Sequence, residues 1–234
     1  MIKKTYFYRI GKVVMLFIFS LMCSNVSYAG VALGATRVIY PAGQKQVQLP
    51  VTNNDQESTY LIQSWVEDAN GKKEGTFIVT PPLFTMKGKK ENTLRIIDVT
   101  NGQLAKDRES LFWLNVKAIP AVDKDLLKSN NLQIAIVSKI KLIYRPSDLD
   151  LPPEEAPSKV RFKRVGNLLT IKNPTPYYLT LTEINAGTRV LENALVPPMG
   201  KIQMTIPADS GSEITYKAIN DYGALTQKIV GKTE

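Results

Sequence analysis

The sequence predicts an all-β protein built from two sandwich domains. From residue 31 onward, apolar residues recur at every second position in short runs, turn signals separate these runs, and no convincing helical period is present. Around residues 146–159 the composition changes to prolines and acids, which divides the chain in two. The seven or so short strands expected before that point indicate an immunoglobulin-like sandwich.

Residues 1–29 have the three parts of a secretory signal peptide. A basic lead is followed by eleven residues (13–23) that are apolar except for Ser20, and a small-x-small cleavage site ends at Ala29. The apolar run is too short to span a membrane. We therefore expect cleavage after Ala29, export, and a soluble mature chain without stable membrane insertion.

The composition excludes several kinds of site. The chain has no histidine, which rules out Ser–His–Asp and Cys–His nucleophiles and His-ligated zinc, so we expect no cofactor and no metal. The single cysteine, Cys23, lies in the signal segment, so the mature chain has no disulfide and depends on its cores for stability. Residues 1–29 hold four basic residues and no acid, so their removal lowers the net charge from +9 to +5. The remaining basic residues are scattered without interleaved aromatics, and we expect no nucleic-acid partner.

In the first domain, turn signals separate the expected strands. Asn70-Gly71, for example, favours a tight hairpin. Trp65 and Trp113 lie mid-strand among apolar residues, and we expect both in the core. The expected strands cover residues 31–40, 44–51, 59–66, 76–80, 93–99, 110–119 and 132–145.

The strand expected over residues 132–145 is unusually long. Its apolar side chains occupy every second position, with Ser138 the only break, which is typical of one face of a strand. At about 3.3 Å per residue it would span roughly 45 Å, whereas an ordinary strand covers about 17–20 Å. A core strand with a frayed end is one interpretation. Because a small sandwich buries only part of such a face, we favour the hypothesis that another protein covers the remainder.

Residues 148–157 are expected to form a semi-rigid linker of prolines and acids. The first domain then comprises residues 30–147 and the second residues 158–234. With about 75 residues, the second sandwich is the less robust of the two, because a small domain buries a smaller fraction of its surface. Its expected strands cover residues 160–171, 177–184, 202–206, 214–219 and 224–230.

Six short motifs occur in order along the mature chain: IYPAG (39–43), PPLF (81–84), RESLFW (108–113), KLIYRP (141–146), NPTPYY (173–178) and INDYG (219–223). Together they resemble the periplasmic chaperones of the chaperone–usher pilus pathway. The resemblance covers the whole mature chain and implies two immunoglobulin-like domains in an L shape, with a non-enzymatic role in the periplasm. A loop of only twelve residues (120–131) without flanking cysteines resembles the short-loop branch of this family.

The resemblance implies a particular mode of binding. Chaperones of this family lend a strand to a pilus subunit whose own sandwich lacks one, which is called donor-strand complementation. Carried over by position, the donated residues are Leu132, Ile134 and Ile136, whose burial is worth roughly 5–8 kcal/mol before ordering costs. Arg37 and Lys141 match the pair that binds the subunit's C-terminal carboxylate and so fixes the register of the donated strand.

Three further residues match a charge cluster that bridges the domains in this family: Glu109, Arg145 and Asp221. We expect it to fix the angle between the domains rather than to form a binding site. The implied partners are fimbrial subunits, including a possible tip adhesin, and the outer-membrane usher. By the same resemblance, the usher contact is expected on the first domain.

Other functions remain open from the residues alone. A pilus subunit is also secreted and β-rich, but it resembles a single incomplete sandwich and usually contains a cysteine pair. A secreted enzyme would need a pair of acids in a motif context, and the sequence offers none. A carbohydrate-binding sandwich has only Tyr177 and Tyr178 in its favour, and a rigid turn that leads into a half-buried strand is the better account of them.

Overall fold

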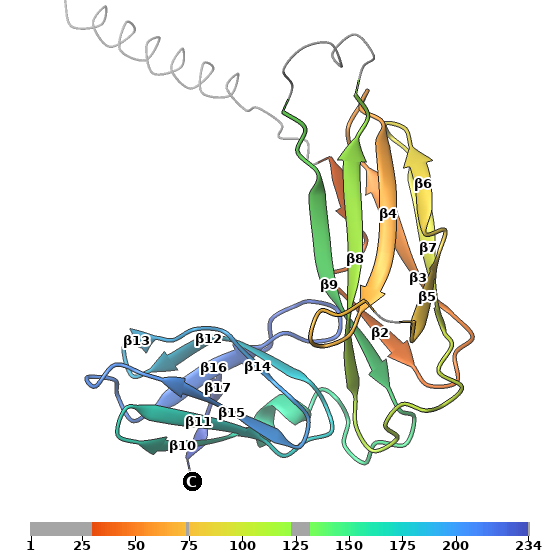
Figure 1. The fold of residues 1–234 in the computed structure, drawn as a ribbon. Coiled ribbons are helices and arrows are strands. Elements are labelled where there is room, and N and C mark those ends of the chain that lie inside the picture. Colours follow the sequence, from red (N-terminus) through yellow and green to blue (C-terminus); the bar gives the residue numbers. More distant parts are fainter. Residues whose placement is uncertain (1–29, 74, 123–131, 234) are drawn as a thin grey trace, which may run out of the picture.

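The computed structural model describes residues 30–73, 75–122 and 132–233, and these form two β-sandwiches joined in an L shape (Figure 1). The prediction of an all-β protein with two sandwich domains is confirmed. In Figure 1 the first domain stands upright and the second lies beside its lower end. The expected signal peptide, residues 1–29, and residues 123–131 of the expected loop lie outside the described residues.

The first domain packs two sheets face to face. Within the described residues, the sheet orders are β1-β3-β7-β5 and β2-β9-β8-β4-β6. The strands are β1 (Val31–Leu33), β2 (Arg37–Pro41), β3 (Val47–Asn53), β4 (Tyr60–Glu67), β5 (Phe77–Thr80), β6 (Leu83–Met86), β7 (Glu91–Asp98), β8 (Ser110–Pro120) and β9 (Ile136–Arg145).

The second domain is a smaller sandwich. In the part of the chain that the structure describes, its sheet orders are β15-β11-β10-β18 and β13-β12-β16-β17, with β14 also paired to β12. The strands are β10 (Arg161–Val165), β11 (Leu168–Asn173), β12 (Leu179–Ala186), β13 (Arg189–Val190), β14 (Ala194–Val196), β15 (Gly200–Thr205), β16 (Ile214–Ala218), β17 (Ile229–Val230) and β18 (Lys232–Thr233).

Each domain has its own apolar core because its strands bury alternate side chains. On β8, Leu114 and Val116 face the first core, and on the neighbouring β9 Leu142 does the same. In the second domain, Phe162 and Tyr216 pack with their ring centroids 5.3 Å apart. Neither core contains a disulfide, so this burial supplies most of the stabilisation.

Two expected strands are each divided in the structure. Residues 31–40 form β1 and β2, which belong to different sheets because the chain crosses the sandwich between them. Residues 160–171 form the β10–β11 hairpin, which turns at Gly166 with a φ of +58°. Glycine adopts this left-handed conformation at no steric cost, and an Asn follows it, so the turn signal was present in the sequence.

The expectation that Trp65 and Trp113 fill the core is wrong. Both are half-buried on the outer face of the sheet that contains β4, β8 and β9, and neither belongs to the core cluster. On β4, the buried residues that face the core are Ile62, Ser64 and Val66, so Trp65 points the other way. Its indole instead donates a hydrogen bond of 2.8 Å to the Glu67 carboxylate.

The long strand begins later than expected, at Ile136 rather than at Leu132. Its ladder with β8 ends where Ile136 pairs with Ala118, and two residues further on β8 ends at Pro120. Proline has no N–H to donate, so the ladder cannot continue past it. Gln133 nevertheless remains attached to this end, since its Nε2 donates to the Pro120 carbonyl at 2.6 Å.

The proline-rich segment between the domains packs against the second domain. Its end forms a short 3-10 helix, Ala156–Lys159, with Ala156 fully buried in the second core. The Tyr216 hydroxyl donates to the Pro157 carbonyl at 2.6 Å, and the Tyr177 hydroxyl donates to the Leu151 carbonyl. These contacts give the chain between the two sandwiches a defined path.

Candidate functional site

The residues at the start of the long strand are exposed apolar side chains. Leu132 is 88% exposed, and Ile134 and Ile136 are each 66% exposed. Within β9, Ile136 lies on the same face as Leu142, which is in the core, and Leu132 and Ile134 continue the same spacing ahead of the strand. None of the three belongs to the core cluster, whereas Ile140 packs against it. Each large apolar side chain left in water forgoes roughly 1.5–3 kcal/mol of burial. This is an apolar face without a cover in the described part of the chain.

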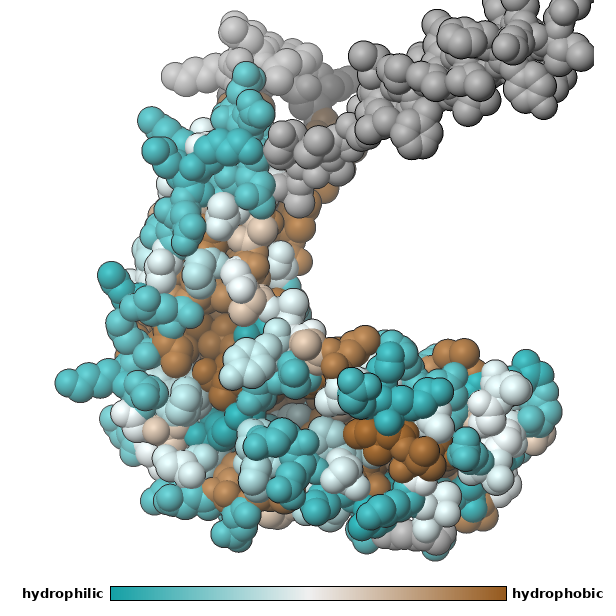
Figure 2. All heavy atoms as spheres, turned by 180° about the vertical axis from the view of Figure 1, so that it is seen from behind, coloured by the Kyte–Doolittle hydropathy of each residue, from teal (hydrophilic) through white to brown (hydrophobic). Residues whose placement is uncertain are grey.

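The strand that carries these residues also has an open edge. On one side β9 pairs with β8 along Ile136–Tyr144, but on the other side β2 pairs only with Lys141–Arg145. Among the described residues, nothing pairs with the second edge of β9 over 136–140, because β1 has crossed to the opposite sheet. β9 lies on the concave side of the L (Figure 1), where hydrophobic residues gather along the inner margin of the first domain (Figure 2). Unpaired backbone groups beside an apolar face can accept another strand.

The closed part of the edge carries two basic residues. Arg37 on β2 and Lys141 on β9 are direct register partners in the parallel pair, so their side chains share one face. Arg37 is only 8% exposed, and its Nη1 donates to the Ile219 carbonyl of the second domain at 3.1 Å. Its Nε is buried without a hydrogen-bond partner among the described residues. One donor of this guanidinium therefore has no acceptor among the described residues.

Lys141 is half-buried, and within the described residues no ion pair reaches its ammonium. Burial, together with the positive charge of Arg37, lowers the pKa of Lys141. Burial also lowers the pKa of Arg37, although Asp221 and Glu109 oppose this shift. Two adjacent, partly desolvated cations form a site that favours an anion, and a carboxylate fits the planar fork of Arg beside the compact charge of Lys.

The three acidic and basic residues predicted to bridge the domains do meet. Arg145 Nε contacts Glu109 Oε1 at 2.7 Å, while Nη1 and Nη2 contact the two carboxylate oxygens of Asp221 at 2.6 and 2.8 Å. The second oxygen of Glu109 accepts the Tyr178 N–H at 2.7 Å. Glu109 and Arg145 belong to the first domain, whereas Asp221 and Tyr178 belong to the second. Two contacts of the cluster, Arg145 with Asp221 and Glu109 with the Tyr178 N–H, therefore cross between the two sandwiches.

Burial and pairing oppose each other in this cluster. Glu109 is 3% exposed, and burial raises the pKa of its carboxyl, against the effects of Arg145 and the Tyr178 N–H. Burial alone would lower the pKa of Arg145, but its hydrogen bonds and ion pairs with Asp221 and Glu109 outweigh burial and raise it. Because Glu109 and Arg145 are largely removed from water, these two charges depend on their partners far more than a surface pair would.

A cavity of about 290 Å³ lies between the domains beside the cluster. Arg37, Arg145 and Asp221 line it, together with three tyrosines. Tyr177 is buried with its ring 5.1 Å from the Arg145 guanidinium, so it does not form an exposed platform for a sugar. Tyr222, by contrast, is 94% exposed.

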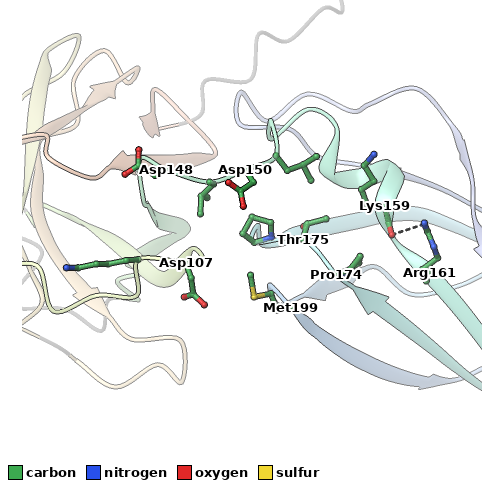
Figure 3. Close-up of a pocket in the computed structure, with 12 residues that line it drawn as sticks. Asp107, Asp148, Asp150, Lys159, Arg161, Pro174, Thr175 and Met199 are labelled. Carbon is green, nitrogen blue, oxygen red and sulfur yellow. Dashed lines mark hydrogen bonds between the residues drawn. The ribbon is translucent and has the colours of Figure 1, made fainter.

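A second cavity, of about 670 Å³, lies at the junction of the domains and contains none of the predicted site residues. Figure 3 shows that the carboxylates of Asp107, Asp148 and Asp150 point in different directions there. The Arg161 guanidinium donates a hydrogen bond of 2.8 Å to the Lys159 carbonyl.

The described residues contain no group of three or more acidic, His or Cys side chains that could hold a metal ion. None of the helices in the described part of the chain is long and apolar enough to cross a membrane.

Sequence reasoning missed the apolar part of the domain contact. Leu111 on β8 and Ile143 on β9 are register partners on the outer face of their sheet, yet both are buried. Ile143 lines the cavity between the domains. A signal was available: Leu111-Phe112 and Leu142-Ile143-Tyr144 are consecutive apolar residues, which is typical of strands buried on both faces.

Comparison with known proteins gives matches over both domains. Residues 30–150 match the family model for the N-terminal domain of PapD, a pili and flagellar-assembly chaperone, and residues 155–229 match the model for the C-terminal domain of the pili assembly chaperone PapD. The chain is 68% identical over 215 residues to the chaperone protein FimC of Escherichia coli strain K12, which covers 92% of this chain and 89% of FimC. It is 66% identical over 206 residues to the chaperone protein FocC of Escherichia coli, covering 88% of this chain and 91% of FocC.

Solved structures agree with these matches. The periplasmic chaperone SfaE superposes with a TM-score of 0.77 at 64% identity, covering 87% of this chain and all of SfaE. The structure of the SafB chaperone in complex with the SafA pilin of Salmonella enterica gives a TM-score of 0.77 at 33% identity, covering 88% of this chain and 97% of that one.

Proposed function

The chain belongs to the family of pili-assembly chaperones, and on that premise we propose that it binds fimbrial subunits by lending them the open edge of β9. It is a fimbrial chaperone and not an enzyme. The proposed donor residues are Leu132, Ile134 and Ile136. The observation that carries the proposal is that exposed apolar side chains lie at every second position beside an edge that no described strand pairs.

The chemistry of the edge supports this proposal. A subunit that lacks one strand exposes a groove with an apolar floor and unpaired backbone groups. The segment from Leu132 to Ile140 offers both complements, because alternate apolar side chains can enter the groove while the backbone completes the ladder. The SafB chaperone is named in complex with a pilin, and SafB is 33% identical to this chain.

We further propose that Arg37 and Lys141 bind the C-terminal carboxylate of the subunit. Lys141 lies five residues along β9 from Ile136, and Arg37 is its register partner on β2, so a subunit strand paired with the open edge would end near them. The guanidinium of Arg37 would supply donors, as would the Lys141 ammonium, which no carboxylate of the described residues pairs. Anchoring one end fixes the register, since a slip of one residue would turn every donated side chain to the wrong face.

Replacing Lys141 with alanine is expected to leave the chaperone folded and to weaken subunit binding by about 10–100-fold, the value of one hydrogen bond to a charged group. The measurement is coexpression with a fimbrial subunit in the periplasm, followed by quantification of the soluble one-to-one complex. Lys139→Ala is the matched control. Lys139 lies on the same face two residues away, but it pairs with Glu67 at 2.7 Å. Full recovery of the complex with Lys141→Ala would contradict the anchor.

The remaining features complete the proposal. Residues 1–29 would direct export and be cleaved after Ala29, which would place the chain in the periplasm, as the name of the periplasmic chaperone SfaE suggests.

A tip adhesin is a proposed partner alongside ordinary subunits, because a free carboxylate and an open groove are all that this edge recognises. We propose domain limits of 30–147 and 158–234, with 148–157 as the linker. The cluster of Glu109, Arg145 and Asp221 then holds the two domains at a fixed angle.

The outer-membrane usher is the proposed acceptor of the loaded chaperone, with its contact on the first domain. A photo-crosslinking residue can be placed in the full chain at Leu83, which is 55% exposed in the first domain, or at Val190, which is 77% exposed in the second. We expect the first position to crosslink to an usher in the presence of a subunit, and the second position not to. Crosslinking from Val190 alone would refute this placement.

A further inference from the structure

The two anchor cations belong to a longer row of side chains. Register pairs connect Glu67 on β4 to Trp113 on β8, Trp113 to Lys141 on β9, and Lys141 to Arg37 on β2. Residues that are directly opposite in neighbouring strands share a face, so these four side chains form one line across the sheet. Trp113 is thus the immediate neighbour of Lys141 on the side away from Arg37.

The indole ring of Trp113 lies close to two ammonium groups. Lys139 Nζ is 5.3 Å from the ring centroid, and Lys141 Nζ is 5.8 Å from it. Both distances fall within the range of about 6 Å in which an indole face attracts a cation. Lys139 is also paired with the Glu67 carboxylate at 2.7 Å. Lys141 has no such partner in the described part of the chain.

Several effects disfavour a Lys141 ammonium held close to Arg37. Its neighbour Arg37 carries the same charge, the site is partly desolvated, and lysine has a flexible four-carbon stem. A carboxylate beside Lys141 would retain the ammonium but would also occupy its donors and cancel its charge. An aromatic face attracts the ammonium and leaves its N–H groups free to donate elsewhere.

We propose that Trp113 is a positioning residue of the anchor: its indole holds the Lys141 ammonium near Arg37 in a form that can still donate to a carboxylate. This inference rests on the proposed function, because it assumes that Arg37 and Lys141 bind the C-terminal carboxylate of a subunit. It extends the anchor from two charged residues to a third, uncharged one that does not touch the ligand.

The test compares two synthetic peptides of identical sequence, the C-terminal segment of a pilin, one with a free carboxylate and the other with a carboxamide. The readout is the ratio of their affinities for the full-length chaperone. We expect Trp113→Leu to reduce the preference for the free acid by about two- to five-fold, and Trp113→Phe to give an intermediate value. Trp65→Leu is the matched control, because Trp65 contacts Glu67 rather than Lys141, and its ratio should equal that of the wild type.

A second measurement avoids any change in packing. Fluorinated tryptophans weaken the negative face of the ring while nearly preserving its shape, and in a Trp65→Phe background they label only Trp113. We expect the acid-to-amide ratio to fall steadily as fluorine atoms are added. This series decides the question even if Trp113→Leu does not fold.

The outcomes separate the inference from the function on which it rests. If the wild type prefers the acid but Trp113→Leu and the fluorinated forms keep the full preference, Trp113 does not position Lys141 and the inference is overturned. If the wild type binds acid and amide equally, the carboxylate anchor itself is wrong, and both statements fall. A fall in the affinity for both peptides without any change in their ratio would show a structural role only, which also overturns the inference.

Discussion

Replacing Ile134 with glutamate is expected to abolish recovery of a soluble subunit complex while the chaperone itself stays folded. Ile134 is 66% exposed and lies outside the core cluster, so the free protein loses little when it changes. In the proposed complex the same position would bury a carboxylate in an apolar groove. The loss of apolar burial and the desolvated charge together should weaken binding by roughly a thousandfold or more.

The control for this change is Val137→Glu. Val137 is also exposed, at 47%, and lies three residues further along, within β9, where its side chain points to the face opposite that of Ile136. We expect Val137→Glu to support complex recovery close to that of the wild type, as measured by coexpression and size-exclusion chromatography. If Ile134→Glu and Val137→Glu gave equal recovery, subunit binding would not depend on which of the two side chains is changed. The assignment of Ile134 as a donor residue would then be wrong.

Replacing Arg145 with alanine is expected to destabilise the protein by about 3–5 kcal/mol and to loosen the angle between the domains. Glu109 is only 3% exposed, and in this variant its carboxylate loses the guanidinium that pairs with it. Asp221 loses its ion pair with Arg145 as well. A buried charge that has lost its partner is far more costly than a missing surface pair. Urea unfolding measures the stability, and small-angle X-ray scattering measures the spread of the two domains.

Arg108→Ala provides the comparison for Arg145. Arg108 lies next to Glu109 in sequence, but its side chain is 42% exposed and pairs with its neighbour Asp107 on the surface. We expect no measurable change in its unfolding midpoint. The double variant Glu109→Gln with Arg145→Met should recover most of the stability, because it removes both buried charges together. An Arg145→Ala variant as stable as Arg108→Ala would mean that the cluster does not hold the domains.

Apolar residues at every second position predicted the β-sandwich fold well, because this alternation depends only on residues that are near one another in the sequence. The parity of the long strand was correct: the apolar residues of one phase include Leu142 in the core and Ile136 in water. The same rule could have placed Trp65 on the outer face, since Ser64 lies between the buried residues Ile62 and Val66 and shares their phase. A preference for large aromatic residues in cores outweighed the alternation in that prediction, and the alternation was the better guide.

Features that depend on pairing between distant strands could not be derived from alternation. Arg37 and Lys141 become neighbours only because β2 pairs in parallel with the end of β9, and each alone reads as an ordinary surface cation. The contact of Asp221 with Arg145 depends on how the two sandwiches dock. Both sets of residues were named from a family resemblance. Trp113 was missed as a neighbour of Lys141 because the register of β8 against β9 cannot be derived from the sequence of either strand alone.

Hydrogen exchange along β9 tests the central claim most directly. In the free chaperone, amides of residues 136–140 that point toward β8 should exchange slowly, while those that point to the open edge should exchange fast. In the complex with a fimbrial subunit, both sets should be protected, with the open-edge amides slowed by about a hundredfold or more. A stable complex in which the open-edge amides still exchange as in the free protein would show that no strand pairs there, and it would contradict donor-strand binding by this chain.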